Sequence, residues 1–240
     1  MSKKVFFVFL IISVLVFVVI APKFVLAAGV PNGATITPQS NKTAGTGTAG
    51  EHAAIAGNLT ELVVTGFTST QSWQGYYGNV SGTIQLADGS SNVFYNWSQA
   101  NAEGEILASN TSSVQWSTIS CFDMATRKDS VEGTYNIGAT DVDGLNETFS
   151  GNTHPAFTVA AASFGLDTCN ATKVFGPNAA ATFTEVLLDD GLNNIVFASL
   201  LADDTVGFDN APHDFEMLVL EDGHGTDVVA VTYYFFVELG

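Results

Sequence analysis

The sequence predicts an all-β protein, mainly an antiparallel sandwich or barrel, with a small helical insertion around residues 120–153. Short runs rich in β-branched and aromatic residues recur along the chain, and Asp-Gly turns separate several of them. One stretch, 120–153, lacks the alternation that strands show, and it predicts a short helix between Ser120 and Lys128 and another after Asp129. Residues 58–240 are therefore expected to form a single globular domain of about 180 residues, a common size for one hydrophobic core.

The first 28 residues determine where the chain is expected to work. Lys3 and Lys4 precede a largely apolar run over 5–20, and Ala27 and Ala28 follow as small residues at a cleavage position. This order is typical of a secretory signal peptide. A retained membrane anchor is the alternative, but the apolar run is shorter than the roughly 20 residues that span a bilayer. We expect a secreted, extracellular or cell-surface protein without membrane insertion after signal cleavage.

Residues 29–57 predict a flexible leader, because their Gly, Ala and Thr side chains bury too little apolar area to offset backbone ordering. One strand-like island, Ala34–Thr37, interrupts this segment. An open sheet edge of a neighbouring copy would accept such a strand. An ordinary spacer between the cell and the domain is the other interpretation of the same residues.

Within the globular region, the turn signals are clearest at Asp88-Gly89 and at Asp189-Asp190-Gly191, each between two apolar runs. Residues 221–225 predict a third hairpin, joining the last two strands. Aromatic residues on both faces of the final strand predict a central strand that is covered on both sides. Strands are expected over 61–67, 72–77, 80–86, 93–97, 105–108, 113–118, 157–164, 182–188, 194–201, 214–220 and 228–239.

The chain is strongly acidic, with a formal net charge of −17. All 24 acidic residues follow the expected signal peptide. Such a charge repels phosphate backbones, so we expect no nucleic-acid partner. After residue 28 the only basic side chains are Lys42, Arg127, Lys128 and Lys173.

Two cysteines, Cys121 and Cys169, predict one disulfide, because an isolated pair outside the cytosol is usually oxidised. Metal binding is the alternative, but neither cysteine has a second ligand at metal-site spacing. Seven Asn-x-Ser/Thr sequons predict a glycosylated surface. They begin at Asn41, Asn58, Asn79, Asn96, Asn110, Asn146 and Asn170.

A calcium site is one interpretation of the loop that contains Asp141, Asp143 and Asn146, because these residues place oxygen ligands beside a glycine. The loop lacks the remaining positions of an EF-hand, and solvated acidic turns are the commoner origin of such a pattern. No other cofactor is expected.

Trp73, Tyr76 and Tyr77 predict either a stacking platform for sugars or, more often for aromatics on a strand, core packing. A hydrolase is a weaker alternative. The sequence has no Gly-x-Ser-x-Gly elbow, and His213-Asp214 has no recognisable partner nucleophile. A pair of catalytic carboxylates would leave no motif in the sequence.

Three segments, 73–80 (WQGYYGNV), 213–219 (HDFEMLV) and 233–238 (YYFFVE), resemble a group of exported, uncharacterised archaeal cell-surface proteins rich in β-structure. The resemblance implies an archaeal envelope or extracellular setting and no catalytic residues. We therefore expect a secreted or surface-attached structural glycoprotein, such as an envelope component or filament subunit. Its expected partners are copies of itself or other surface proteins. A carbohydrate-binding module with glycan partners is the alternative, and a hydrolase with a carboxylate site is the third.

Overall fold

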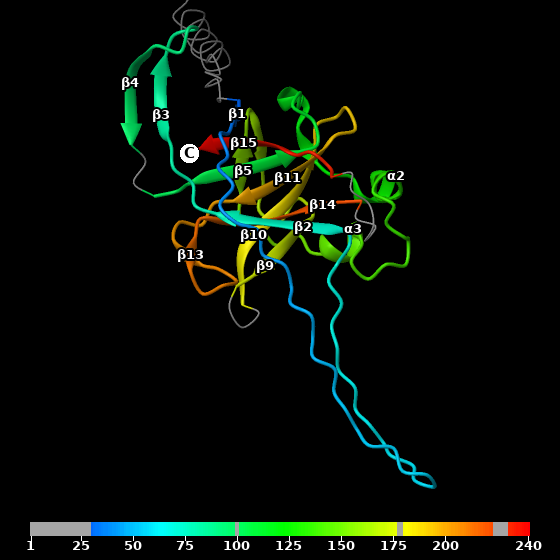
Figure 1. Cartoon of the computed structure of the whole chain (residues 1–240). Coiled ribbons are helices and arrows are strands. Elements are labelled where there is room, and N and C mark those ends of the chain that lie inside the picture. Colours follow the sequence, from blue (N-terminus) through cyan, green and yellow to red (C-terminus); the bar gives the residue numbers. More distant parts are fainter. Residues whose placement is uncertain (1–29, 99–100, 177–179, 223–229) are drawn as a thin grey trace, which may run out of the picture.

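The computed structural model describes residues 30–98, 101–176, 180–222 and 230–240 (Figure 1). The expected signal peptide lies outside the described residues. Most of the described elements are strands in antiparallel sheets, and the two α-helices are short, which confirms the all-β prediction. The helices lie within the predicted insertion at 120–153.

The first half of the chain contributes strands β1 (Asn32–Gly33), β2 (Trp73–Gly78), β3 (Thr83–Ala87), β4 (Val93–Ser98), β5 (Gly104–Ser109) and β6 (Ser120–Cys121), the 3-10 helix η1 (Trp116–Thr118), and helices α2 (Met124–Thr134) and α3 (Leu145–Thr148). The second half contributes β7 (Phe157–Val159), β8 (Ala162–Phe164), β9 (Ala171–Phe175), β10 (Ala181–Asp189), β11 (Ile195–Leu200), β12 (Thr205–Val206), β13 (Pro212–His213), β14 (Phe215–Leu220) and β15 (Tyr234–Leu239).

A seven-stranded antiparallel sheet forms the centre of the protein, in the order β1-β15-β5-β11-β10-β6, with β9 also paired to β10. Both of its faces are buried. On β11, Ile195 and Phe197 belong to one hydrophobic cluster, whereas Val196 and Ala198 belong to the other. This alternation follows from the two-residue period of a strand. The main sheet is therefore the middle layer of the body.

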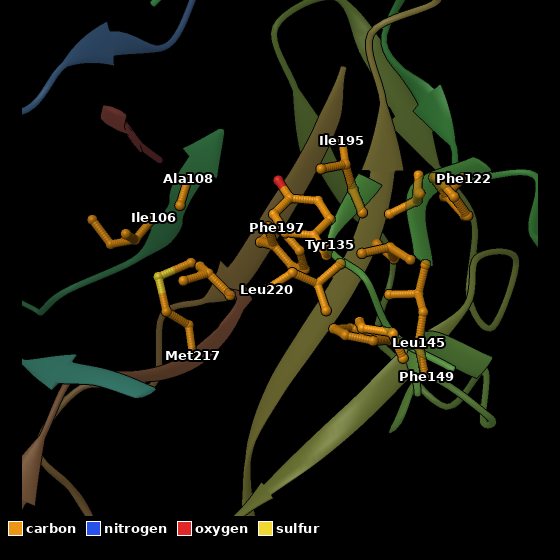
Figure 2. Close-up of a cluster of buried hydrophobic side chains, with 14 residues drawn as sticks. Ile106, Ala108, Phe122, Tyr135, Leu145, Phe149, Ile195, Phe197, Met217 and Leu220 are labelled. Carbon is orange, nitrogen blue, oxygen red and sulfur yellow. The ribbon is translucent and has the colours of Figure 1, made fainter. Parts of the chain in front are cut away.

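The second layer on one face is a pair of strands, β14 and β2, together with both helices. Met217 on β14 lies opposite Tyr76 on β2. Strand β14 also packs against β10 and β11, so the pair lies over the centre of the sheet. Figure 2 shows how Phe149 and Leu145 from the helical insertion meet Phe197 from the sheet in this cluster. This packing turns a two-stranded ribbon into part of a core.

The β7–β8 hairpin and the segment around η1 cover the opposite face. Phe157 and Phe164 stack on each other with ring centroids 4.7 Å apart. The predicted disulfide is present: Cys121 and Cys169 are bonded, with Cα atoms 5.1 Å apart. It joins β6 to the residue before Asn170, and Cys169 is buried in this second cluster. The disulfide therefore ties the start of the helical insertion to the segment that leads into β9.

The helical insertion has one continuous helix where the sequence predicted a break near Asp129. Asp123 caps it, because its carboxylate accepts hydrogen bonds from the backbone N–H groups of Ala125 and Thr126. Arg127 forms an ion pair with Asp189 at the end of β10, which fixes the helix against the sheet. The helix therefore starts four residues later than the earliest predicted start at Ser120 and continues to Thr134.

The predicted hairpin of the last two strands is wrong. Strand β14 pairs with β2 in the second layer, whereas β15 pairs with β5 in the main sheet. Within the described residues, the last strand begins at Tyr234, and residues 228 and 229 of the predicted strand lie outside them. It is covered on both faces as predicted, but it is next to the edge, since only the two-residue β1 pairs on its other side.

Three other strand predictions are also wrong. Residues 61–67 form no strand, residues 113–118 contain the 3-10 helix, and 157–164 form a hairpin of two strands. By contrast, the Asp-Gly turns do connect β3 with β4 and β10 with β11. Local turn chemistry was therefore a better guide than β-propensity alone, which needs a neighbouring strand to take effect.

Candidate functional site

An extended arm, residues 43–69, projects from the body (Figure 1). It runs outward to a turn at Ala56–Gly57 and then returns. Gly57 has a φ of +88°, a conformation that glycine adopts without strain. All the side chains of the arm are exposed. The arm includes most of the predicted flexible leader and the residues 61–67 that were expected to begin the globular domain.

Both ends of the arm are fixed to the body. At the outgoing end, Lys42 Nζ lies 2.7 Å from Asp209 Oδ2 and 5.1 Å from the ring centroids of Tyr77 and Phe208. At the returning end, the Thr70 hydroxyl donates a hydrogen bond to the Asp143 carboxylate. The arm is therefore held at both ends, and the residues between these two contacts are accessible to a partner.

The ion pair at Lys42 is also part of a small network. His213 Nε2 lies 2.9 Å from Asp209 Oδ1, so the aspartate is shared between a lysine and a histidine. The hydrogen bond from Lys42, followed by that with His213, holds the pKa of Asp209 well below its usual range. The predicted partner of His213, Asp214, instead accepts hydrogen bonds from the backbone N–H groups of Val80 and Asp204. These contacts are structural and resemble no nucleophile–base pair.

The returning half of the arm contains an apolar stretch that lacks any pairing partner. Residues 59–67 belong to no strand, and their backbone has no hydrogen-bond partner among the described residues. Val63 is 94% exposed and Phe67 71% exposed. β-branched residues favour strands but need a neighbouring strand to pack against. The stretch therefore has the composition of a strand and the surroundings of a coil.

The β3–β4 hairpin is a second exposed apolar element. It projects from the body away from the arm (Figure 1). Its register places Ile84 opposite Trp97 and Leu86 opposite Tyr95. Because strand residues alternate between faces, these four side chains share one face. Each of the four is 44% to 56% exposed. The apolar face of the hairpin is thus uncovered.

The other face of the hairpin has mostly polar side chains, together with Phe94, which is 85% exposed. Thr83 lies opposite Ser98 and Gln85 opposite Asn96, which begins one of the predicted sequons. A glycan on Asn96 would therefore extend from the polar face and leave the apolar face accessible. Such an amphipathic pattern is typical of a strand pair with one covered face. Within the described residues, nothing covers the apolar face of this hairpin.

The predicted aromatic platform is divided between two faces of β2. Trp73 packs near Phe149 and Phe197, with centroid distances of 6.0 and 6.4 Å, and its Nε1 donates to the Asp143 carbonyl at 2.6 Å. Tyr76 meets Phe235 edge to face at 5.1 Å.

Tyr77, the next residue along the strand, points the other way. Its ring lies against Phe208 and His213 at 4.8 and 4.9 Å. Adjacent strand residues face opposite sides, so the three rings do not form one flat surface. Their contacts are packing contacts, and sugar stacking on them stays a prediction.

The predicted calcium ligands lie at a polar cleft of about 420 Å³. Asp141 and Asp143 line it together with Asp222 and Tyr135, whereas Asn146 lies on α3 and is not among the lining residues. The carboxylate of Asp141 accepts a hydrogen bond from the Gly138 N–H at 2.7 Å, and that of Asp143 accepts from Thr70. Among the described residues, no group of three or more His, Cys, Asp or Glu side chains is arranged to hold a metal ion. Calcium binding stays a prediction.

Six of the seven sequon asparagines are exposed, and Asn170 is the exception. Asn170 is half-buried, and its side-chain nitrogen donates a hydrogen bond to the Phe149 carbonyl at 3.2 Å. The same nitrogen is the atom that a glycan would modify. The exposed asparagines are Asn41, Asn58, Asn79, Asn96, Asn110 and Asn146.

Among the titratable groups that the sequence did not reveal are Glu185 and Glu105, which are buried, and Glu238, which is half-buried, because nothing in the pattern shows which face a strand carboxylate occupies. Glu185 is fully buried between β10 and β14, where it accepts a hydrogen bond from the Leu218 N–H at 2.8 Å. Burial raises the pKa of Glu185 well above its usual value. Burial also raises the pKa values of Glu105 and Glu238 on the opposite face. Glu185 and Glu105 lie inside the packed body.

No helix among the described residues is long and apolar enough to cross a membrane. The chain matches no protein-family model, no curated protein and no solved structure. Its distinguishing features are therefore those of its own surface: the arm, the amphipathic hairpin and the exposed sequons.

Proposed function

We propose that this protein is an exported structural glycoprotein of the cell surface that works by associating with copies of itself, as an envelope component or filament subunit. One observation carries the proposal. The body is packed on both faces of its sheet, yet two projecting elements expose apolar side chains. Contiguous exposed apolar surface is typical of interaction sites.

The remaining support is chemical. The disulfide between Cys121 and Cys169 suits an oxidising compartment such as the cell exterior. Six exposed sequon asparagines suit a glycosylated surface. A strongly negative charge disfavours nucleic acids and anionic membranes as partners, but it does not affect contacts made by uncharged segments.

Native purification from the producing cell, followed by electron microscopy, tests this function. We expect filaments, sheets or other repeating assemblies in the material recovered from the envelope or the medium. Light scattering after size-exclusion chromatography should give a mass that rises with concentration. A protein that is monomeric in both preparations would contradict the proposal.

A second function, glycan binding, is favoured by the polar cleft beside Trp73. The cleft has a volume in the range of small-ligand sites and is lined by carboxylates and hydroxyls, which suit sugar hydroxyl groups. Asp222 Oδ1 is buried and has no hydrogen-bond partner among the described residues. Asp222→Asn should weaken binding on a glycan array, whereas the exposed control Asp204→Asn should not. Equal binding by both variants and the wild type would remove the cleft from consideration.

A further inference from the structure

Among the residues described, the stretch 59–67 of the arm lacks a sheet to join, and the β3–β4 hairpin lacks further strands. In the described part of the chain, the stretch 59–67 is a single strand-like segment without a sheet, and β3–β4 is a two-stranded sheet without a third strand. An isolated two-stranded hairpin is marginally stable in water, and three strands with a covered apolar face are needed for independent stability. Each element therefore supplies what the other needs.

The free edge of the hairpin is β4. Strand β3 lies nearer to the body, and the Leu239 side chain at the end of β15 lies close to Gly82, just before β3. Figure 1 shows β4 on the outer side of the hairpin. An outer strand presents a row of unpaired backbone N–H and C=O groups, which accept an added strand.

Electrostatic repulsion does not oppose contact between the stretch 59–67 and the hairpin. In a chain with a net charge of −17, the stretch 59–67 has only Glu61, and the hairpin has only Asp88, at its turn. The stretch has apolar side chains on both faces, with Val63 and Phe67 on one and Leu62 and Val64 on the other. A strand that is apolar on both sides suits an assembly, where both of its faces are covered.

The two elements point away from each other in one copy. The arm leaves the body on the side opposite the hairpin, and both ends of the arm are fixed, at Lys42 and Thr70 (Figure 1). A contact between the stretch and the hairpin therefore joins two copies. Because donor and acceptor are different surfaces, the contact is heterologous and repeats from copy to copy.

We propose that residues 59–67 of one copy of this chain add as a third strand to the free edge of β4 in the next copy. The added strand completes a three-stranded sheet and extends the apolar face that contains Ile84, Leu86, Tyr95 and Trp97. This inference rests on the proposed function and identifies the contact through which the copies associate. The leader island Ala34–Thr37, for which strand donation was one of two interpretations, forms no strand. The neighbouring residues 32–33 pair with β15 of their own chain.

Two variants separate donor from acceptor. Val63→Pro removes a backbone N–H from the stretch and should disable the donor, because proline cannot complete a strand ladder. Ala53→Pro, in the same exposed arm but outside the stretch, is its control. Ile84→Asp places a charge on the apolar face of the hairpin and should disable the acceptor. Gln85→Asp, the next residue on the polar face, is its control.

Sedimentation velocity of the full secreted protein measures the result. Each disabling variant should raise the concentration of half-assembly by about tenfold or more, the effect of about 1.4 kcal/mol, while both controls match the wild type. The decisive sample is an equimolar mixture of Val63→Pro and Ile84→Asp. Each copy keeps one intact half of the contact, so the mixture should form a heterodimer and stop there.

The outcomes are distinct. Wild-type assembly that neither variant weakens, or a mixture that stays monomeric, overturns this contact and leaves the proposed function standing. A wild type that is monomeric at every concentration overturns both. Binding of that monomer to phosphatidylcholine vesicles, weakened by Ile84→Asp and not by Gln85→Asp, would assign the hairpin face to a lipid surface instead.

Discussion

Glu105 on β5 and Glu238 on β15 lie directly opposite each other, on the sheet face that the β7–β8 hairpin covers. Glu238 Oε2 accepts a hydrogen bond from the Ala160 N–H at 2.7 Å. Burial, and then the neighbouring Glu238 carboxylate, raise the pKa of Glu105 to about 8. Two adjacent carboxylates, of which Glu105 is buried and Glu238 half-buried, cannot both ionise without a large cost, so the pair keeps at least one proton near neutral pH.

The first prediction follows from that pair. A folded-state pKa above the unfolded value means that the folded protein binds the proton more tightly. The stabilisation from Glu105 is then fully present below about pH 4.5, declines above it and is absent above about pH 8. Glu105→Gln cannot titrate at this position. Between pH 5 and 8 its free energy of unfolding should therefore fall by about 2 to 4 kcal/mol less than that of the wild type.

Urea unfolding at pH 5, 6.5 and 8 measures this effect, with the exposed Glu61→Gln as the control. The carboxylates whose pKa values are lowered, such as Asp88 and Asp123, lose their contributions only at pH values below 3.8, the ordinary pKa of an aspartate. They therefore leave the chosen window unaffected. Parallel pH profiles for the wild type and Glu105→Gln would rule out the raised pKa.

The second prediction concerns the disulfide. Bonding Cys121 to Cys169 closes a loop with a sequence separation of 48, which should stabilise the fold by about 4 kcal/mol in the loop-entropy model. Mass spectrometry before and after reduction should show a gain of two hydrogens, and reduction should lower the free energy of unfolding. Two thiols that alkylate freely without a reductant would contradict the bond.

The third prediction compares two tryptophans. Trp73 packs on Phe149 and Phe197, so Trp73→Ala should cost about 3 kcal/mol of stability, at the lower end for aromatic truncation because the ring is half-buried. Calorimetry should show a Tm lower by about 6 to 12 °C.

Trp97 is the matched control, since it lies on the exposed face of the hairpin. Trp97→Ala should leave the Tm of the monomer within about 2 °C, as for other surface substitutions, and weaken assembly instead. If Trp73→Ala kept the wild-type Tm and lost binding on a glycan array, Trp73 would be a sugar-binding residue.

The fourth prediction concerns the sequons. In a host that glycosylates Asn-x-Ser/Thr, the exposed Asn96 should be modified, and Asn170 should stay bare because its side-chain nitrogen donates to the Phe149 carbonyl. Glycopeptide mass spectrometry of secreted protein provides the site-by-site occupancy. High occupancy at Asn170 would mean that the modification precedes formation of this hydrogen bond in the folded body.

The elements that the sequence predicted well were those with local causes. Asp189-Asp190-Gly191 joins β10 and β11 because the turn chemistry lies between two adjacent runs, and Asp190 accepts hydrogen bonds from Leu192 and Asn194 within the same loop. The disulfide was predictable because only two cysteines exist. The helical insertion was predictable because residues 120–153 lack a two-residue period.

The elements that it missed depend on distant partners. Strand β14 pairs with β2, whose Tyr76 is far from Met217 in the sequence, and no local signal distinguishes this pairing from a hairpin with β15. Residues 61–67 have strand composition but no neighbouring strand among the residues that the structure describes. The candidate site was therefore only partly predictable. The apolar face of the hairpin follows from the register of β3 with β4, whereas its exposure depends on where the hairpin lies relative to the body.

Hydrogen exchange on native assemblies, compared with dissociated monomer, tests the central claim most directly. We predict that backbone N–H groups in 59–67, and those of β4 that do not donate to β3, are protected in the assembly and exchange rapidly in the monomer, because strand addition supplies their hydrogen-bond partners. The outgoing part of the arm, 43–52, should exchange rapidly in both states. Assemblies in which 59–67 and β4 exchange as fast as in the monomer would contradict the account.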